Sequence, residues 1–74
     1  MKFKCHGYKI EYTEMDHLGR LEDIQEDISL AHNDNVDVVA DYDGDNVIVE
    51  ITGDANESTV MEILNEQFTT ISKE

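Results

Sequence analysis

Residues 35–52 constrain the fold most, because apolar and polar side chains alternate there on both sides of an Asp43-Gly44 dipeptide. Such alternation is typical of half-buried β-strands. Asp-Gly is a strong signal for a two-residue type I′ turn, since both central positions of that turn need a positive φ. We therefore expect an antiparallel hairpin with Asp43 and Gly44 at its tip. Three apolar pairs then share the core face: Ala40 with Val47, Val38 with Val49, and Val36 with Ile51.

The opposite face of the expected hairpin carries charge. The same register places Asp37 opposite Glu50, and like charges in that position destabilise a sheet. It also places Val39 opposite Ile48, inside a rim of carboxylates that includes Asp41. An apolar centre with a polar rim is typical of interfaces. The Val39/Ile48 spot could therefore dock a partner or a second copy of the chain.

A first helix is expected at residues 17–32, with Asp16 as a candidate N-cap. Its carboxylates include two like-charge pairs four residues apart, Glu22 with Glu26 and Asp23 with Asp27, and each pair destabilises a helix by roughly 0.2–0.5 kcal/mol. The apolar positions at helical spacing are Leu18, Leu21, Ile24, Ile28 and Ala31.

A second helix is expected at residues 55–71. Asp54 followed by Glu57 resembles a capping box, and this gives both residues a structural role at the helix N-terminus. Glu62 and Glu66 lie on the polar side of this helix. Its apolar side comprises Val60, Met61, Ile63, Leu64, Phe68 and Ile71.

Residues 2–13 alternate in the manner of a strand, and His6-Gly7 is either a second tight turn or a bulge in one long strand. The 74 residues form one domain, 1–74. The order of these elements predicts an α+β fold of two layers, in which an antiparallel sheet of three or four strands carries both helices on one face.

The charge balance excludes several classes of function. The chain has 5 Lys and Arg against 18 Asp and Glu, so its net charge is −13. From Leu21 to Ser72 there are fourteen carboxylates and no Lys or Arg. Such a chain is steered toward cationic partners and away from nucleic acid or an anionic membrane surface. Cys5 is the single cysteine, and no stretch resembles a signal peptide or a membrane span, so we expect a cytoplasmic protein.

Metal sites and catalysis have weak support. Asp41, Asp43 and Asp45 with Glu50 resemble a calcium loop, but Gly44 precedes the third acid where the calcium motif needs its glycine after it.

The other candidate ligands, Cys5, His6, His17 and His32, lack the spacing of a structural zinc site. Cys5 is expected in the core and the histidines on the surface. No carboxylate is marked as a general acid or base, and no phosphate loop or activated nucleophile is present in the sequence. We therefore expect no metal, no cofactor and no enzymatic activity.

The acidic surface itself is the strongest candidate site. Residues four apart on a helix rise about 6 Å, while phosphates of one DNA strand advance about 3.4 Å per step along the duplex axis and lie farther apart along the winding strand. Rows of carboxylates at this density can imitate a row of phosphates. The residues that would carry the mimicry are Glu22, Asp23, Glu26, Asp27, Asp37, Asp41, Asp43, Asp45, Glu50, Glu62 and Glu66.

A small, proline-free, acidic chain of this layout resembles phage-encoded DNA-mimic proteins, most of all the small phage inhibitor of the bacterial nucleoid protein HU. The resemblance covers size, charge and layout, and no short motif carries it. It implies an inhibitor that occupies the DNA-binding surface of a basic host protein. The alternative is a small acidic adaptor that binds a host enzyme or assembly through an apolar spot without imitating DNA. A small core and the Val39/Ile48 spot also suggest a homodimer.

Overall fold

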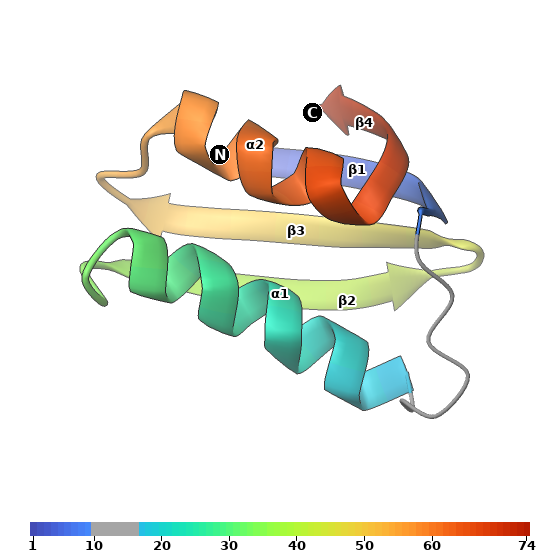
Figure 1. Ribbon diagram of the computed structural model, residues 1–74, viewed down its shortest axis with the longest axis horizontal. Coiled ribbons are helices and arrows are strands. Elements are labelled where there is room, and N and C mark those ends of the chain that lie inside the picture. The colour runs from blue at the N-terminus through green and yellow to red at the C-terminus, as the bar shows by residue number, and fades with distance from the viewer. Residues whose placement is uncertain (10–16) are drawn as a thin grey trace.

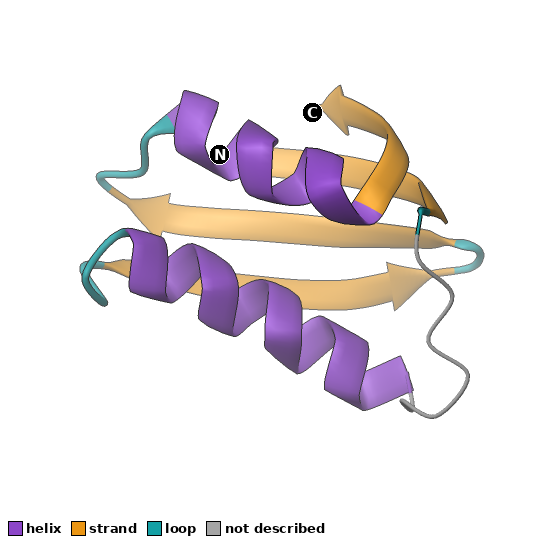
Figure 2. Ribbon diagram, in the orientation of Figure 1, coloured by secondary structure: helices purple, strands orange, loops and turns teal. Residues whose placement is uncertain are grey.

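The computed structural model describes the backbone of residues 1–9 and 17–74 and the side chains of residues 1–9 and 19–74. The elements are β1 (Lys2–Tyr8), α1 (His17–Ala31), β2 (Val36–Asp43), β3 (Asn46–Gly53), α2 (Glu57–Gln67) and β4 (Phe68–Lys73). The four strands pair antiparallel in the order β2-β3-β1-β4. Both helices lie on the same face of this sheet, α1 on the β2 side and α2 on the β1 side (Figures 1 and 2). The expected two-layer α+β fold is confirmed.

One apolar core lies between the two layers. Every strand and both helices contribute to it, and no polar or charged side chain of the described residues is buried. Phe3 and Cys5 of β1 lie at its centre, fully buried, as the alternation predicted. The other buried members are Leu21, Ile24, Ile28, Val36, Ala40, Val47, Val49, Ile51, Val60, Leu64 and Phe68.

The β2–β3 hairpin forms, but its register differs from the predicted one by two residues. Val38 lies opposite Ile51 and Ala40 opposite Val49, so the predicted pairs are wrong. The two-residue loop is Gly44-Asp45 rather than Asp43-Gly44, and of these two only Gly44 has a positive φ, of 62°. That pattern fits a type II′ turn, which needs glycine only at its first central position. A shift of two residues preserves the side-chain period, so the predicted core face is confirmed.

The new register also separates the predicted like-charge pair. Asp37 lies opposite Thr52, and Glu50 lies opposite Val39 in β2 and opposite Lys2 in β1. The predicted repulsion between directly facing Asp37 and Glu50 is therefore absent from the sheet.

β1 is one strand, with Gly7 inside it. Of the two alternatives left open for His6-Gly7, the structure has the single strand and not the tight turn, because His6 pairs with Thr70 and Tyr8 with Phe68 of β4. Gly7 has a φ of 74°, a backbone conformation that residues with a side chain rarely adopt. Beyond it, the Tyr8 ring packs against buried Phe68, with ring centroids 5.1 Å apart. The rest of the strand predicted to reach residue 13 lies outside the described residues.

α1 ends close to the predicted boundary, and its candidate N-cap, Asp16, lies outside the described residues. Asn33 and Asp34 follow it with positive φ values of 54° and 59°, a conformation that Asn and Asp tolerate better than most residues. The Asp34 N–H donates to the Ser29 carbonyl at 2.9 Å and the Ser29 hydroxyl donates to the Asp34 carboxylate at 2.8 Å. These contacts close the last turn and direct the chain into β2.

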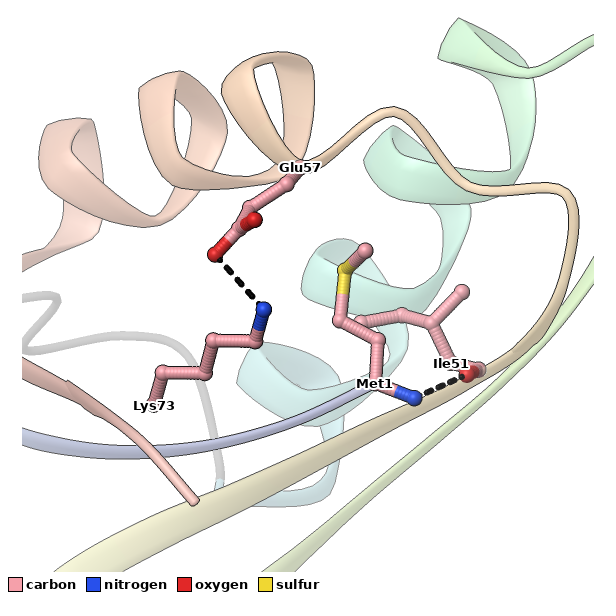
Figure 3. A network of polar contacts seen from close by, with 4 residues as sticks. All are labelled: Met1, Ile51, Glu57 and Lys73. Atoms are coloured by element: carbon pink, nitrogen blue, oxygen red, sulfur yellow. Dashed lines mark hydrogen bonds and ion pairs between the residues drawn. The ribbon is translucent and has the colours of Figure 1, made fainter.

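α2 starts later than predicted. Its N-cap is Asn56, whose side-chain oxygen accepts the Thr59 N–H at 3.1 Å. The predicted capping role of Asp54 is therefore wrong, because an amide oxygen two residues later fills it. Glu57 stands in the first turn of the helix and forms an ion pair with Lys73 of β4, at 3.0 Å (Figure 3).

The chain also leaves α2 earlier than predicted. The helix ends at Gln67, and residues 68–73 form β4, so the predicted helix through Ile71 is wrong. The run Thr69-Thr70-Ile71 is β-branched, which lowers helix propensity and favours a strand. Ile71 pairs with Cys5 in the middle of β1, on the side of β1 that faces away from β3. The sheet therefore has a fourth strand beside β1. Phe68 remains buried, as predicted.

Candidate functional site: an acidic surface on α1, β2 and β3

Charge is separated across the sheet. Residues 17–53, which form α1, β2, β3 and their loops, hold ten carboxylates and one basic residue, Arg20. Residues 1–9 and 54–74 hold five carboxylates and four lysines. The strand order β2-β3-β1-β4 places these two groups on opposite sides of the molecule (Figure 1). We call residues 17–53 the acidic half.

Most of the predicted partner-binding residues fall in this acidic half. Asp23 is half-buried and the other members are exposed. Glu62 and Glu66 are also exposed, but they lie on α2 in the other half. The nine residues that the fold gathers on the acidic half are Glu22, Asp23, Glu26, Asp27, Asp37, Asp41, Asp43, Asp45 and Glu50.

A groove joins α1 to the edge strand β2. It has a volume of about 370 Å³, and its lining is Glu22, Gln25, Glu26 and Ser29 of α1 with Val36, Asp37 and Val38 of β2. The groove brings two acidic residues of α1, Glu22 and Glu26, close to Asp37 of β2, which lies on another element. Only the packing of α1 along β2 produces this grouping, so sequence periodicity alone does not reveal it.

The face of the sheet opposite the helices also carries carboxylates, because Asp37 and Asp41 alternate along β2 with buried Val36 and Ala40. Asp37 and Asp41 of β2 stand on it at intervals set by the strand rise of about 3.4 Å per residue. The exposed carboxylates therefore continue from α1, through the groove, around the β2 edge and onto this open face. A basic cleft that closes on the β2 edge would meet carboxylates on both of its walls.

The predicted Val39/Ile48 spot is narrower than expected. Val39 is 57% exposed, but it lies opposite Glu50 rather than Ile48. Ile48 is half-buried and stands between Asp41 of β2 and Lys4 of β1. Val39 and Ile48 are therefore diagonal neighbours, and charged side chains interrupt the apolar surface around them.

Cys5 and the histidines are held within the fold in different ways. Cys5 is a free, fully buried cysteine, and burial raises the pKa of its thiol to about 11. The His6 ring nitrogen Nδ1 lies 3.0 Å from the Asn46 side-chain oxygen. In the part of the chain that the structure describes, no three His, Cys, Asp or Glu side chains converge as metal ligands would.

His32 has a structural role that sequence reasoning missed. Its Nδ1–H donates to the Ile28 carbonyl at 2.8 Å, and its Nε2 accepts the Asn56 N–H at 2.9 Å. The half-buried ring therefore connects the end of α1 to the N-cap of α2. A lone histidine after a helix carries no sequence signal for such a bridge, because Asn56 is 24 residues away.

Among the described residues, no helix has both the length and the apolar character needed to cross a membrane. Comparison of the chain with protein-family models, with curated proteins and with solved structures finds no match.

Proposed function

We propose that this protein is a non-enzymatic DNA mimic whose acidic half occupies the DNA-binding surface of a basic DNA-binding protein, with the bacterial nucleoid protein HU as the first target. The observation that supports this proposal is the separation of charge, with ten carboxylates and a single arginine in residues 17–53. A charge that served solubility alone would have no need to be concentrated on one side of the sheet.

The proposed mechanism is direct competition. Lys and Arg side chains that hold phosphates in the DNA complex would instead hold carboxylates of α1 and of the β2 edge. Long-range attraction would speed the encounter, and the four lysines of the other half would orient the molecule with its acidic half toward the basic target.

The test is competition of the protein with labelled DNA for purified HU at two salt concentrations. The protein should release the DNA, and its own affinity for HU should fall with salt. This decrease in affinity with salt should be less steep than the decrease for DNA. Part of the salt dependence of DNA binding comes from release of ions condensed on the duplex, and a folded acidic protein condenses fewer ions.

Two other results would each reject part of the proposal. A ternary complex, in which DNA stays bound while the protein also binds, would exclude mimicry and favour the adaptor function. Absence of any binding would exclude HU as the target, and the same competition would then be run with other basic DNA-binding proteins.

A further inference from the structure

We propose that the groove between α1 and β2 binds an extended, basic peptide segment, which adds to the free edge of β2 as a further antiparallel or parallel strand. The inference rests on the proposed function only for the basic character of the partner. Its test uses peptides rather than DNA, so failure of one proposal can be distinguished from failure of the other.

The first support is the direction of the β2 backbone groups. The Ile51 N–H donates to the Met1 carbonyl at 2.7 Å. The Ile51 carbonyl accepts from the Met1 amine at 3.1 Å, the contact drawn in Figure 3. Both backbone groups of Ile51 therefore face β1. Val38 lies opposite Ile51, so in antiparallel pairing its own N–H and C=O point away from β3.

The same alternation applies along the strand. Val36 and Ala40, two residues to either side of Val38, direct their backbone groups to the same edge. Within the described part of the chain, β2 pairs with β3 alone. Val36 and Val38 also line the groove, so their outward backbone groups lie where an extended segment would pair with them. Peptides bind exposed sheet edges in this mode, and backbone hydrogen bonds supply much of the affinity.

The second support is charge on both sides of that edge. Successive side chains of an added strand would alternate between the α1 side and the open sheet face. On the α1 side they would meet Glu22 and Glu26, and on the open face Asp37 and Asp41. Both sets of positions therefore favour Lys or Arg, and the fitting segment is basic at consecutive positions.

The same charges disfavour a second copy of this chain as the occupant. Pairing of β2 with β2 would bring the acidic groove of one protomer against that of another, in a chain whose net charge is −13. Like charges opposite one another destabilise strand pairing. Charge complementarity therefore selects a cationic segment.

The probe is a short synthetic oligolysine peptide, basic at consecutive positions, added to the full-length protein and followed by NMR of the backbone amides. Its control is the same peptide N-methylated at alternate residues, which keeps the charge but removes the donors needed for strand pairing. We expect the unmethylated peptide to slow hydrogen exchange at Val36, Val38 and Ala40. The methylated peptide should bind at least about tenfold more weakly, since several interstrand hydrogen bonds are lost.

A matched pair of variants tests the walls of the groove. Glu22→Gln with Glu26→Gln should weaken binding of the unmethylated peptide about tenfold, because charge-assisted contacts are lost. Glu62→Gln with Glu66→Gln removes the same amount of charge from the exposed side of α2. This variant should change the affinity for the unmethylated peptide less than about twofold. Equal binding of the two peptides, or equal effects of the two variants, would overturn the inference. So would sedimentation showing that protomers associate through β2 and exclude the peptide.

Discussion

Gly7 and Gly44 both have a positive φ, of 74° and 62°, but they differ in their surroundings. A Cβ on Gly7 would collide with the Thr69 hydroxyl, whereas one on Gly44 would meet nothing within 4 Å. Gly44→Ala should therefore lower the free energy of unfolding by about 1 kcal/mol, for the backbone conformation alone.

Gly7→Ala adds steric overlap at the β1–β4 pairing and should lower the free energy of unfolding by about 3 kcal/mol. Urea denaturation of the two variants measures the difference. Equal losses would show that the contact with Thr69 has no energetic effect.

Cys5 gives the stability a defined dependence on pH. Its pKa rises from an ordinary value of 9.0 to about 11 on folding, because burial disfavours the thiolate. Between these values the unfolded chain releases the thiol proton while the folded chain keeps it. The free energy of unfolding should therefore fall with rising pH in this window, by at most about 1.4 kcal/mol per pH unit.

The control for this prediction is Cys5→Ala, which should lose the part of the slope that comes from Cys5. Denaturation of both proteins at pH 8, 9.5 and 11 separates the contributions. Identical slopes would contradict a buried, protonated thiol in the folded state.

At the level of single residues, the sequence predicts burial better than polar partners. Phe3, Cys5 and Phe68 were expected in the core and are buried there. Asn56 and His32 were not identified, because their hydrogen bonds depend on how close α1 and α2 lie. Apolar periodicity is local to an element, whereas such contacts join elements distant in the chain.

At the level of elements, the sequence predicts the existence of the hairpin and of both helices, but it predicts their boundaries less accurately. Asp43-Gly44 and Gly44-Asp45 both fit two-residue turns, so the predicted register was wrong by two residues. β4 was missed because Phe68 and Ile71 also fit the helical spacing of α2. Residues 68–73 form a strand rather than a last helical turn because they pair with β1. Since β1 lies at the other end of the chain, no local sequence pattern reveals this pairing.

The two rows of like charge on α1 lead to a prediction about stability. Glu22 and Glu26 are four residues apart and exposed, so Glu26→Gln should raise the free energy of unfolding by about 0.2–0.5 kcal/mol. Added salt should stabilise the wild type more than this variant, because screening removes the same repulsion.

The matched control is Glu57→Gln on the first turn of α2. It removes the pairing with Lys73 and a favourable helix-terminus charge, so it should lower the free energy of unfolding by up to about 1 kcal/mol. Both variants are compared by urea denaturation at low and high salt. Destabilisation by Glu26→Gln would show that this carboxylate is structural, and would weaken the proposed function.

At the level of the whole molecule, the sequence predicts the carboxylates but not their arrangement. The lysines lie near the two ends of the chain, and only the strand order β2-β3-β1-β4 brings those ends together, away from α1. Glu62 and Glu66 were grouped with the other carboxylates because they share their helical spacing. The fold separates them, because α2 packs on the lysine-bearing half.

The central claim is that the acidic half, rather than net charge, binds the partner. Two variants with equal change in charge test it most directly. One neutralises α1 through Glu22→Gln, Asp23→Asn, Glu26→Gln and Asp27→Asn. The other neutralises exposed carboxylates of the opposite half through Asp54→Asn, Glu62→Gln, Glu66→Gln and Glu74→Gln.

The measurement is the Kd of each variant for purified HU by isothermal titration at one fixed salt concentration. The account predicts that the α1 variant binds at least about tenfold more weakly than the control variant, because it alone loses carboxylates that pair with the basic surface. Equal Kd values for the two variants would contradict the account, because binding would then depend on total charge and not on where the fold places it.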